Sequence, residues 1–171
     1  VTIDPSLHPV SASRYESGYL PDQPAIDFAA KRTELKTANG TLHFNNWKLI
    51  VVRNGIEAGQ YTADWSDYTV GSEGAMIHHV FPGIDAEMIV QRGAIKTSFI
   101  IKSNEFGVFD HLVFREELEG TSPIRAEFSN GTHTRGIGSL KLMAGITEFA
   151  FMDEAKLFAK GGPKSLARSA D

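Results

Sequence analysis

The chain has 171 residues, 42% of them hydrophobic and 22% charged, with a formal net charge of −4. These are ordinary globular values, so we exclude wholesale disorder and a fibrous repeat. Lysine and arginine are scattered, and no basic run is interleaved with aromatic residues, which argues against a nucleic-acid partner. No window approaches the roughly 18 consecutive apolar residues that a membrane span requires. The absence of cysteine excludes thiol nucleophiles and disulfides.

The first 25 residues are rich in proline, with Pro5, Pro9, Pro21 and Pro24. Proline fixes φ and removes a backbone donor. This composition predicts an extended or irregular N-terminal arm over residues 1–25, ahead of a single β domain over residues 26–160. Gly161-Gly162-Pro163 breaks any regular element, so residues 161–171 are predicted to be a tail or a linker.

Beyond the arm, short runs with β propensity alternate with turn sequences. Asn39-Gly40 and Asn54-Gly55 are hairpin signals, because both residue types tolerate the positive φ of a type I′ turn. The predicted strands lie at 26–28, 41–44, 47–53, 56–65, 75–81, 111–118, 124–128, 139–143 and 147–151. Residues 152–160 fit either a short helix or a strand edge. The pattern predicts an all-β fold with little or no helix, an antiparallel β-sandwich or jelly roll.

The most regular pattern covers residues 84–101, two strands around a tight Arg92-Gly93 turn. This turn predicts the pairs Val90 with Ile95, Met88 with Thr97, Ala86 with Phe99 and Ile84 with Ile101. One face of the hairpin is then apolar. Asp85, Glu87, Lys96 and Ser98 share the other face. Such a hairpin is typical of an antiparallel sheet that covers a core on one side.

Phe81-Pro-Gly-Ile-Asp85, followed by Lys96 and Phe99 on the return strand, resembles a motif in β-sandwich modules of large secreted or surface-displayed bacterial proteins, including repeat-rich ones from the Bacteroidetes. The resemblance covers about 25 residues. It implies a structural, adhesive or assembly domain at the cell surface or outside the cell. It brings no catalytic residues with it.

Four aromatic residues are candidates for ligand binding, because exposed rings in a row can stack on sugars: Trp47, Trp65, Tyr61 and Tyr68. The alternative is that these rings fill the core, which is the commoner use of large aromatic side chains.

Four polar residues are candidates for metal binding. His78 and His79 are adjacent, and neighbours on a regular strand point to opposite faces, so one metal would need ligands such as Asp85, Asp110 or His111 from elsewhere. Asp64 and Asp67 lie in an oxygen-rich loop that could hold a structural calcium ion, the one cofactor that we consider. The alternative is a surface histidine pair and a solvated loop.

The sequence favours a non-enzymatic module, since no serine lies in a nucleophile elbow. The leading hypothesis is a structural or adhesive module of a larger bacterial extracellular protein that binds a protein or a glycan through loops and edges. The runner-up is a carbohydrate-active jelly roll, a binding module or a hydrolase or lyase, in which a histidine, Asp85, Glu87 and the tryptophans line a concave face. The third is a homo-oligomer or a subunit of a filament, secretion machine or virion, in which the arm docks as an added strand.

Overall fold

The computed structural model describes residues 4–19, 22–131, 135–152, 156–159, 162–165 and 168–169. In these residues the chain forms β-strands joined by turns, and no helix occurs among them. The predicted all-β class is therefore confirmed. Across the same residues, no helix has the length and apolar character that a membrane span needs.

Residue contacts divide the chain into two compact units, Val1–Glu119 and Gly120–Asp171. The single domain over residues 26–160 stays a prediction, and the strands of the first unit begin before residue 26. Strands β1 to β11 pair among themselves, and strands β12 to β17 form separate pairings. The sequence carries no compositional mark at this boundary, because β signals continue on both sides of it.

The first unit contains two sheets. The large sheet has the strand order β1-β2-β3-β4-β5-β11, and β6 also pairs with β5. Its strands are Leu7–Pro9 (β1), Arg14–Ser17 (β2), Gln23–Asp27 (β3), Arg32–Thr37 (β4), Gly40–Arg53 (β5), Ile56–Thr62 (β6) and His111–Gly120 (β11). The small sheet has the order β10-β9-β8-β7. Its strands are Tyr68–Val70 (β7), Gly74–Phe81 (β8), Ile84–Gln91 (β9) and Ala94–Ile101 (β10).

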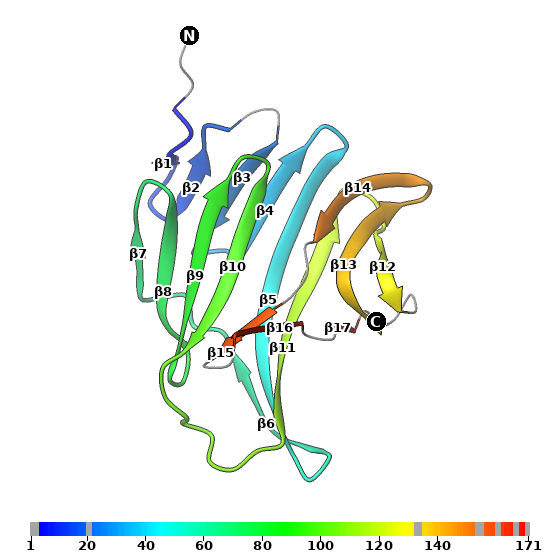
Figure 1. The fold of residues 1–171 in the computed structure, drawn as a ribbon. Coiled ribbons are helices and arrows are strands. Elements are labelled where there is room, and N and C mark those ends of the chain that lie inside the picture. Colours follow the sequence, from blue (N-terminus) through cyan, green and yellow to red (C-terminus); the bar gives the residue numbers. More distant parts are fainter. Residues whose placement is uncertain are drawn as a thin grey trace. The chain divides into compact units, whose positions relative to one another are not determined.

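The two sheets pack face to face around one apolar core, as in a β-sandwich (Figure 1). The large sheet contributes Trp47, Leu49 and Val51 of β5, and the small sheet contributes alternate residues of β9 and four residues of β8, Ala75, Ile77, Val80 and Phe81. Both tryptophans, Trp47 and Trp65, lie in this core, with ring centroids 4.6 Å apart. Burial of large aromatic and aliphatic side chains is the dominant stabilising term for such a layered fold.

The β9–β10 hairpin has the predicted register. Val90 pairs with Ile95, Met88 with Thr97, Ala86 with Phe99 and Ile84 with Ile101. Gly93 adopts a φ of 67° in the turn, a conformation that glycine reaches without steric cost. The predicted apolar face is buried fully on β9, but Ile101 remains 50% exposed. The reason is topological, because β10 forms the edge of the small sheet.

Strand β5 merges two strands that the sequence separates. It runs unbroken for 14 residues, and it pairs first with β4 and then, from Lys48, with β6. Asn46 has a φ of 51° at the change of partner. Because asparagine tolerates this left-handed conformation, the strand can bend there and change which face its odd-numbered residues occupy. After the bend, odd-numbered residues from Trp47 onward enter the core.

The proline-rich segment expected to be an arm contributes three strands to the large sheet. Leu7 of β1 and Tyr15 of β2 pack on the core, and β3 pairs with both β2 and β4. The prolines are tolerated for different reasons. Pro9 ends the short edge strand β1, and Pro24 lies in β3 with its ring fully buried.

In the second unit, β12 (Arg125–Gly131), β13 (Arg135–Ala144) and β14 (Thr147–Met152) form an antiparallel sheet. Leu140 and Leu142 of β13 are buried. A further strand, β17 (Arg168–Ser169), pairs with β13, and β15 (Lys156–Ala159) pairs with β16 (Gly162–Ser165). Of the segment 152–160, the described part that follows Met152 is a strand, and residues 153–155 and 160 lie outside the described residues. The described parts of the expected tail also form strands.

Candidate functional site

Three cross-strand rows of side chains cover the face of β2–β5 that is turned away from the small sheet, which we name the polar face. The rows are Arg14, Asp27, Arg32 and Asn45; then Glu16, Ala25, Glu34 and His43; then Gln23, Lys36 and Thr41. Tyr15 and Ile26, at the alternate positions, contact the core. Because strand side chains alternate, the three rows must lie on the opposite side of the sheet.

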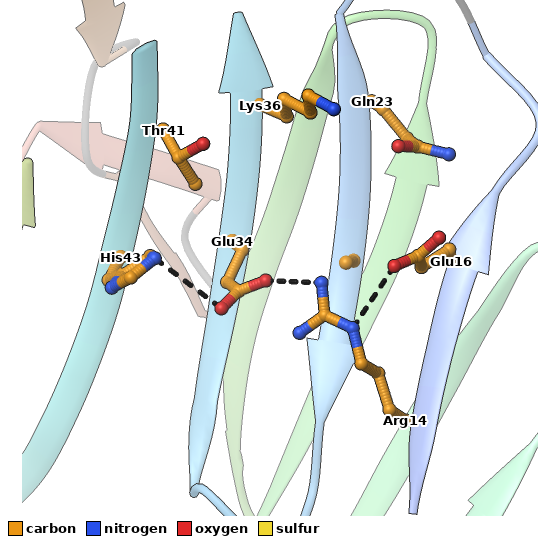
Figure 2. Close-up of a pocket in the computed structure, with 8 residues that line it drawn as sticks. Arg14, Glu16, Gln23, Glu34, Lys36, Thr41 and His43 are labelled. Carbon is orange, nitrogen blue, oxygen red and sulfur yellow. Dashed lines mark hydrogen bonds and ion pairs between the residues drawn. The ribbon is translucent and has the colours of Figure 1, made fainter. Parts of the chain in front are cut away.

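A hollow of about 350 Å³ opens on the polar face. Ala25 is directly opposite Glu16 on one side and Glu34 on the other. The Arg14 side chain bridges these two glutamates across Ala25, and the row of Gln23, Lys36 and Thr41 forms the other end of the hollow (Figure 2). The lining consists of Arg14, Glu16, Gln23, Ala25, Glu34, Lys36, Thr41 and His43.

The Arg14 guanidinium lies between two carboxylates at one end of the hollow (Figure 2). Its Nη2 is 2.5 Å from Glu34 Oε2, and its Nε is 3.1 Å from Glu16 Oε1. Asp27 Oδ2 is 3.6 Å from Nη1. The contact with Glu34 is the main reason that the pKa of Arg14 is raised above its ordinary value. Arg14 is therefore a fixed cation that orders both glutamates.

Glu34 is the most buried charged group of the polar face, with 7% of its side chain exposed. Three basic groups surround its carboxylate. Besides Arg14, Arg32 Nε lies 2.9 Å and His43 Nε2 3.4 Å from Glu34 Oε1. A carboxylate removed from water is tolerated only when it is paired in this way. The network holds the centre of the hollow in one arrangement.

The other end of the hollow has polar groups that remain open to a ligand. In the described part of the chain, the side chains of Lys36 and Thr41 have no hydrogen bond or ion pair. Gln23 Nε2 donates to Ser17 O at 2.9 Å, which leaves the amide oxygen of Gln23 as an acceptor. The hollow thus combines an ordered charged end with an available polar end.

A second polar cluster lies at an irregularity of strand β8. The β8–β9 register shifts between Ile77 and Phe81, and His79 has a φ of 53°. Buried Asp85 accepts the His79 backbone N–H at 3.0 Å and lies 3.0 Å from Lys102 Nζ. The His79 N–H is the largest cause of the lowered pKa of Asp85, and Lys102 contributes further. This cluster fixes the β-bulge.

The four aromatic candidates do not form an exposed platform. Trp47 and Trp65 are each 2% exposed, and Tyr61 and Tyr68 pack partly buried against the same core. Phe28 stacks on Tyr68 with ring centroids 3.7 Å apart. The Trp47 Nε1 donates to Glu116 Oε2 at 2.6 Å, whereas the Trp65 Nε1 has no partner among the described residues. The tryptophans therefore serve as core side chains, the alternative use of aromatic residues.

The four metal candidates lie around the loop that precedes β7 and the bulge of β8. Asp64 accepts from the Ser66 backbone N–H at 2.9 Å, and His78 donates its backbone N–H to Asp67 O at 2.8 Å. The His78 ring lies 3.3 Å from Thr69 Oγ1 and 4.0 Å from Asp85, while His79 is exposed. Across the described residues, no three histidine or acidic side chains are grouped closely enough to hold a metal ion.

Sequence reasoning missed the polar face because it assigned β2 to an irregular arm. A signal was present in the alternation of charged residues, Arg14 with Glu16 and then Arg32, Glu34 and Lys36 at every second position. This pattern is typical of strands with one solvated face. Comparison of the chain with protein-family models, curated proteins and solved structures finds no match.

Proposed function

We propose that the chain is a non-enzymatic adhesive module of a larger bacterial extracellular protein, and that it binds its partner through the polar face. The observation that carries this proposal is the hollow over Ala25, which is lined by seven polar side chains on four adjacent strands. Groups fixed on strands bind with little loss of conformational freedom. Binding sites are commonly such concave surfaces with convergent polar groups.

Both carboxylates of the hollow are engaged by the chain itself, because the Arg14 guanidinium is paired with Glu16 and with Glu34. This arrangement favours binding over turnover. The burial of both tryptophans also weakens the alternative of a carbohydrate-active enzyme with those rings in its cleft.

The extracellular setting is supported by the resemblance of residues 81–101 to modules of secreted and surface-displayed bacterial proteins. The assembly alternative loses its main motivation, because the expected docking arm pairs within the large sheet of its own chain. Deleting residues 1–25 would therefore remove β1, β2 and part of β3 rather than a free arm.

The test measures retention of chain-coated beads on defined layers of neutral polysaccharide, acidic polysaccharide and denatured collagen. Thr41→Arg places a long side chain at the open end of the hollow. Thr97→Arg is the matched control, since Thr97 is an exposed residue of β10 on the other sheet. We expect the wild type and the control to be retained on at least one layer, and Thr41→Arg to lose about nine tenths of that retention.

Release of reducing ends or acyl groups from the layers is assayed in the same samples. Product formation at enzymatic rates that disappears in Glu16→Gln or Glu34→Gln would show that the chain is an enzyme. Retention that is equal in Thr41→Arg, or no retention on any layer, would count against the polar face as the adhesive surface.

A further inference from the structure

We infer that the hollow over Ala25 takes a neutral, polyhydroxylated ligand, a segment of an uncharged polysaccharide. This inference rests on the proposed binding function of the polar face and names the ligand class. It follows from the charge balance of the lining, from its hydrogen-bonding capacity and from its lack of an apolar wall.

The charges of the lining cancel. Arg14 and Lys36 are cationic, and Glu16 and Glu34 are anionic, so the formal sum is zero when His43 is neutral. In the adjacent row, Asp27 and Arg32 also cancel. Both carboxylates of the lining are already paired with Arg14, so Lys36 is the one charged group of the described lining that remains to compensate a phosphate, sulfate or uronate group. An uncharged ligand needs no such compensation.

The available groups suit hydroxyl groups, which both donate and accept hydrogen bonds. Lys36 can donate, the Gln23 amide oxygen can accept, and the Thr41 hydroxyl can do both. These three residues form one cross-strand row, so their groups are presented side by side along the end of the hollow. A sugar ring offers neighbouring hydroxyls in a comparable row.

The size and polarity of the hollow argue against the other classes of partner. Its volume of about 350 Å³ lies at the lower end of the range of small-molecule sites. Ala25 is its one apolar lining residue, so there is no pocket for the aromatic or aliphatic anchor of a protein interface. Without a stacking ring, binding relies on hydrogen bonds that replace those to water, and we expect a Kd on the order of 1 mM.

The test is a titration of the isotopically labelled chain, followed by amide NMR shifts. The probes are the neutral hexasaccharides of glucose (α-1,4 and β-1,4), xylose and mannose, an oligogalacturonate as the acidic counterpart, and a polar uncharged peptide. The double variant Lys36→Ala/Thr41→Ala removes two side chains that have no hydrogen bond or ion pair in the described part of the chain. Lys96→Ala/Thr97→Ala is the matched control, with the same two residue types exposed on β10.

We expect at least one neutral hexasaccharide to shift amides of β3, β4 and β5, and the double variant to weaken this binding about tenfold while the control leaves it unchanged. If a neutral sugar binds the double variant as tightly as the wild type, the assignment of the ligand to the hollow is overturned. If the oligogalacturonate or the peptide shifts these amides and no neutral sugar does, the ligand class is overturned and the adhesive function stands. If no probe binds and the bead assay also shows no retention, both are overturned.

Discussion

The side chain of Asp85 in β9 accepts the backbone N–H of His79 in β8, with 3.0 Å between Oδ1 and the nitrogen. This one contact stabilises a left-handed residue in a strand whose register shifts at the same place. The sequence pattern places Asp85 on the polar face of the hairpin, yet only 5% of this residue is exposed. The hydrogen bond from His79 compensates for the burial of the carboxylate.

Asp85→Ala removes the acceptor of the His79 N–H and leaves that group without a protein partner. We expect a loss of about 1–3 kcal/mol in the free energy of unfolding, measured by chemical denaturation. Asp85→Asn keeps an oxygen at the same position and should lose less, about 1 kcal/mol. Equal losses in the two variants would show that the hydrogen bond does not stabilise the bulge.

The same carboxylate makes stability depend on pH. Its pKa is lowered in the folded chain, so the unfolded state, with an ordinary pKa of about 3.9, binds the proton more tightly. The stabilisation by ionised Asp85 is complete above that value and is lost as the pH falls through the folded pKa. Accordingly, the stability difference between the wild type and Asp85→Asn should be constant near neutral pH and shrink below pH about 4. A difference that grows with acidity would contradict the assignment.

Gly83 and Gly55 provide a matched pair of turn glycines. Both have left-handed φ angles, 70° and 72°. A Cβ at Gly83 would lie 2.5 Å from Ser103 O, whereas one at Gly55 meets no atom within 4 Å. Gly55→Ala should therefore lower the free energy of unfolding only through the strain of a left-handed alanine, by about 1–2 kcal/mol. Gly83→Ala adds a steric clash with backbone and should lose about 3 kcal/mol or more. Thermal unfolding of the two variants provides the measurement, and similar melting temperatures would contradict the prediction.

Glu116 and Glu117 of β11 make contrasting contacts with β5. Glu116 accepts from the buried indole of Trp47, and Glu117 accepts from the exposed Asn46 amide. Glu116→Ala should destabilise the chain by about 1–3 kcal/mol, because a buried N–H loses its acceptor. Glu117→Ala serves as the control and should remain within about 0.5 kcal/mol of the wild type. Tryptophan fluorescence during denaturation reports both, and a larger effect of Glu117→Ala would contradict this account.

The β9–β10 hairpin could be predicted to the residue, because strict alternation over two strands and one glycine turn define its register. The merging of two predicted strands into β5 could not be predicted, because it depends on the left-handed conformation of Asn46. Many sequences tolerate this conformation and few require it. The strands of the N-terminal segment could not be predicted because their prolines argue against a strand. Whether a proline disrupts a strand depends on whether its backbone nitrogen would have to donate a hydrogen bond to a neighbouring strand.

The candidate site shows the same limit. Alternating charges identify one solvated face on each of β2 and β4, but the row of Glu16, Ala25, Glu34 and His43 exists only once four strands are in register. Ala25 has no feature in the sequence that marks it as the floor of a hollow. Aromatic residues and adjacent histidines suggest binding sites by their residue type alone. In the fold, the tryptophans lie in the core and the histidines lie at a bulge.

Strand β5 carries Thr41 and His43 at one end and Trp47, Leu49 and Val51 farther along. Tension that reaches Thr41 and is directed along this strand loads its hydrogen bonds to β4 and β6 in shear. Those hydrogen bonds lie perpendicular to the strand, so they share the load and break together rather than one after another. For the adhesive role that we propose, this geometry predicts that a weakly bound polymer detaches before strand β5 does.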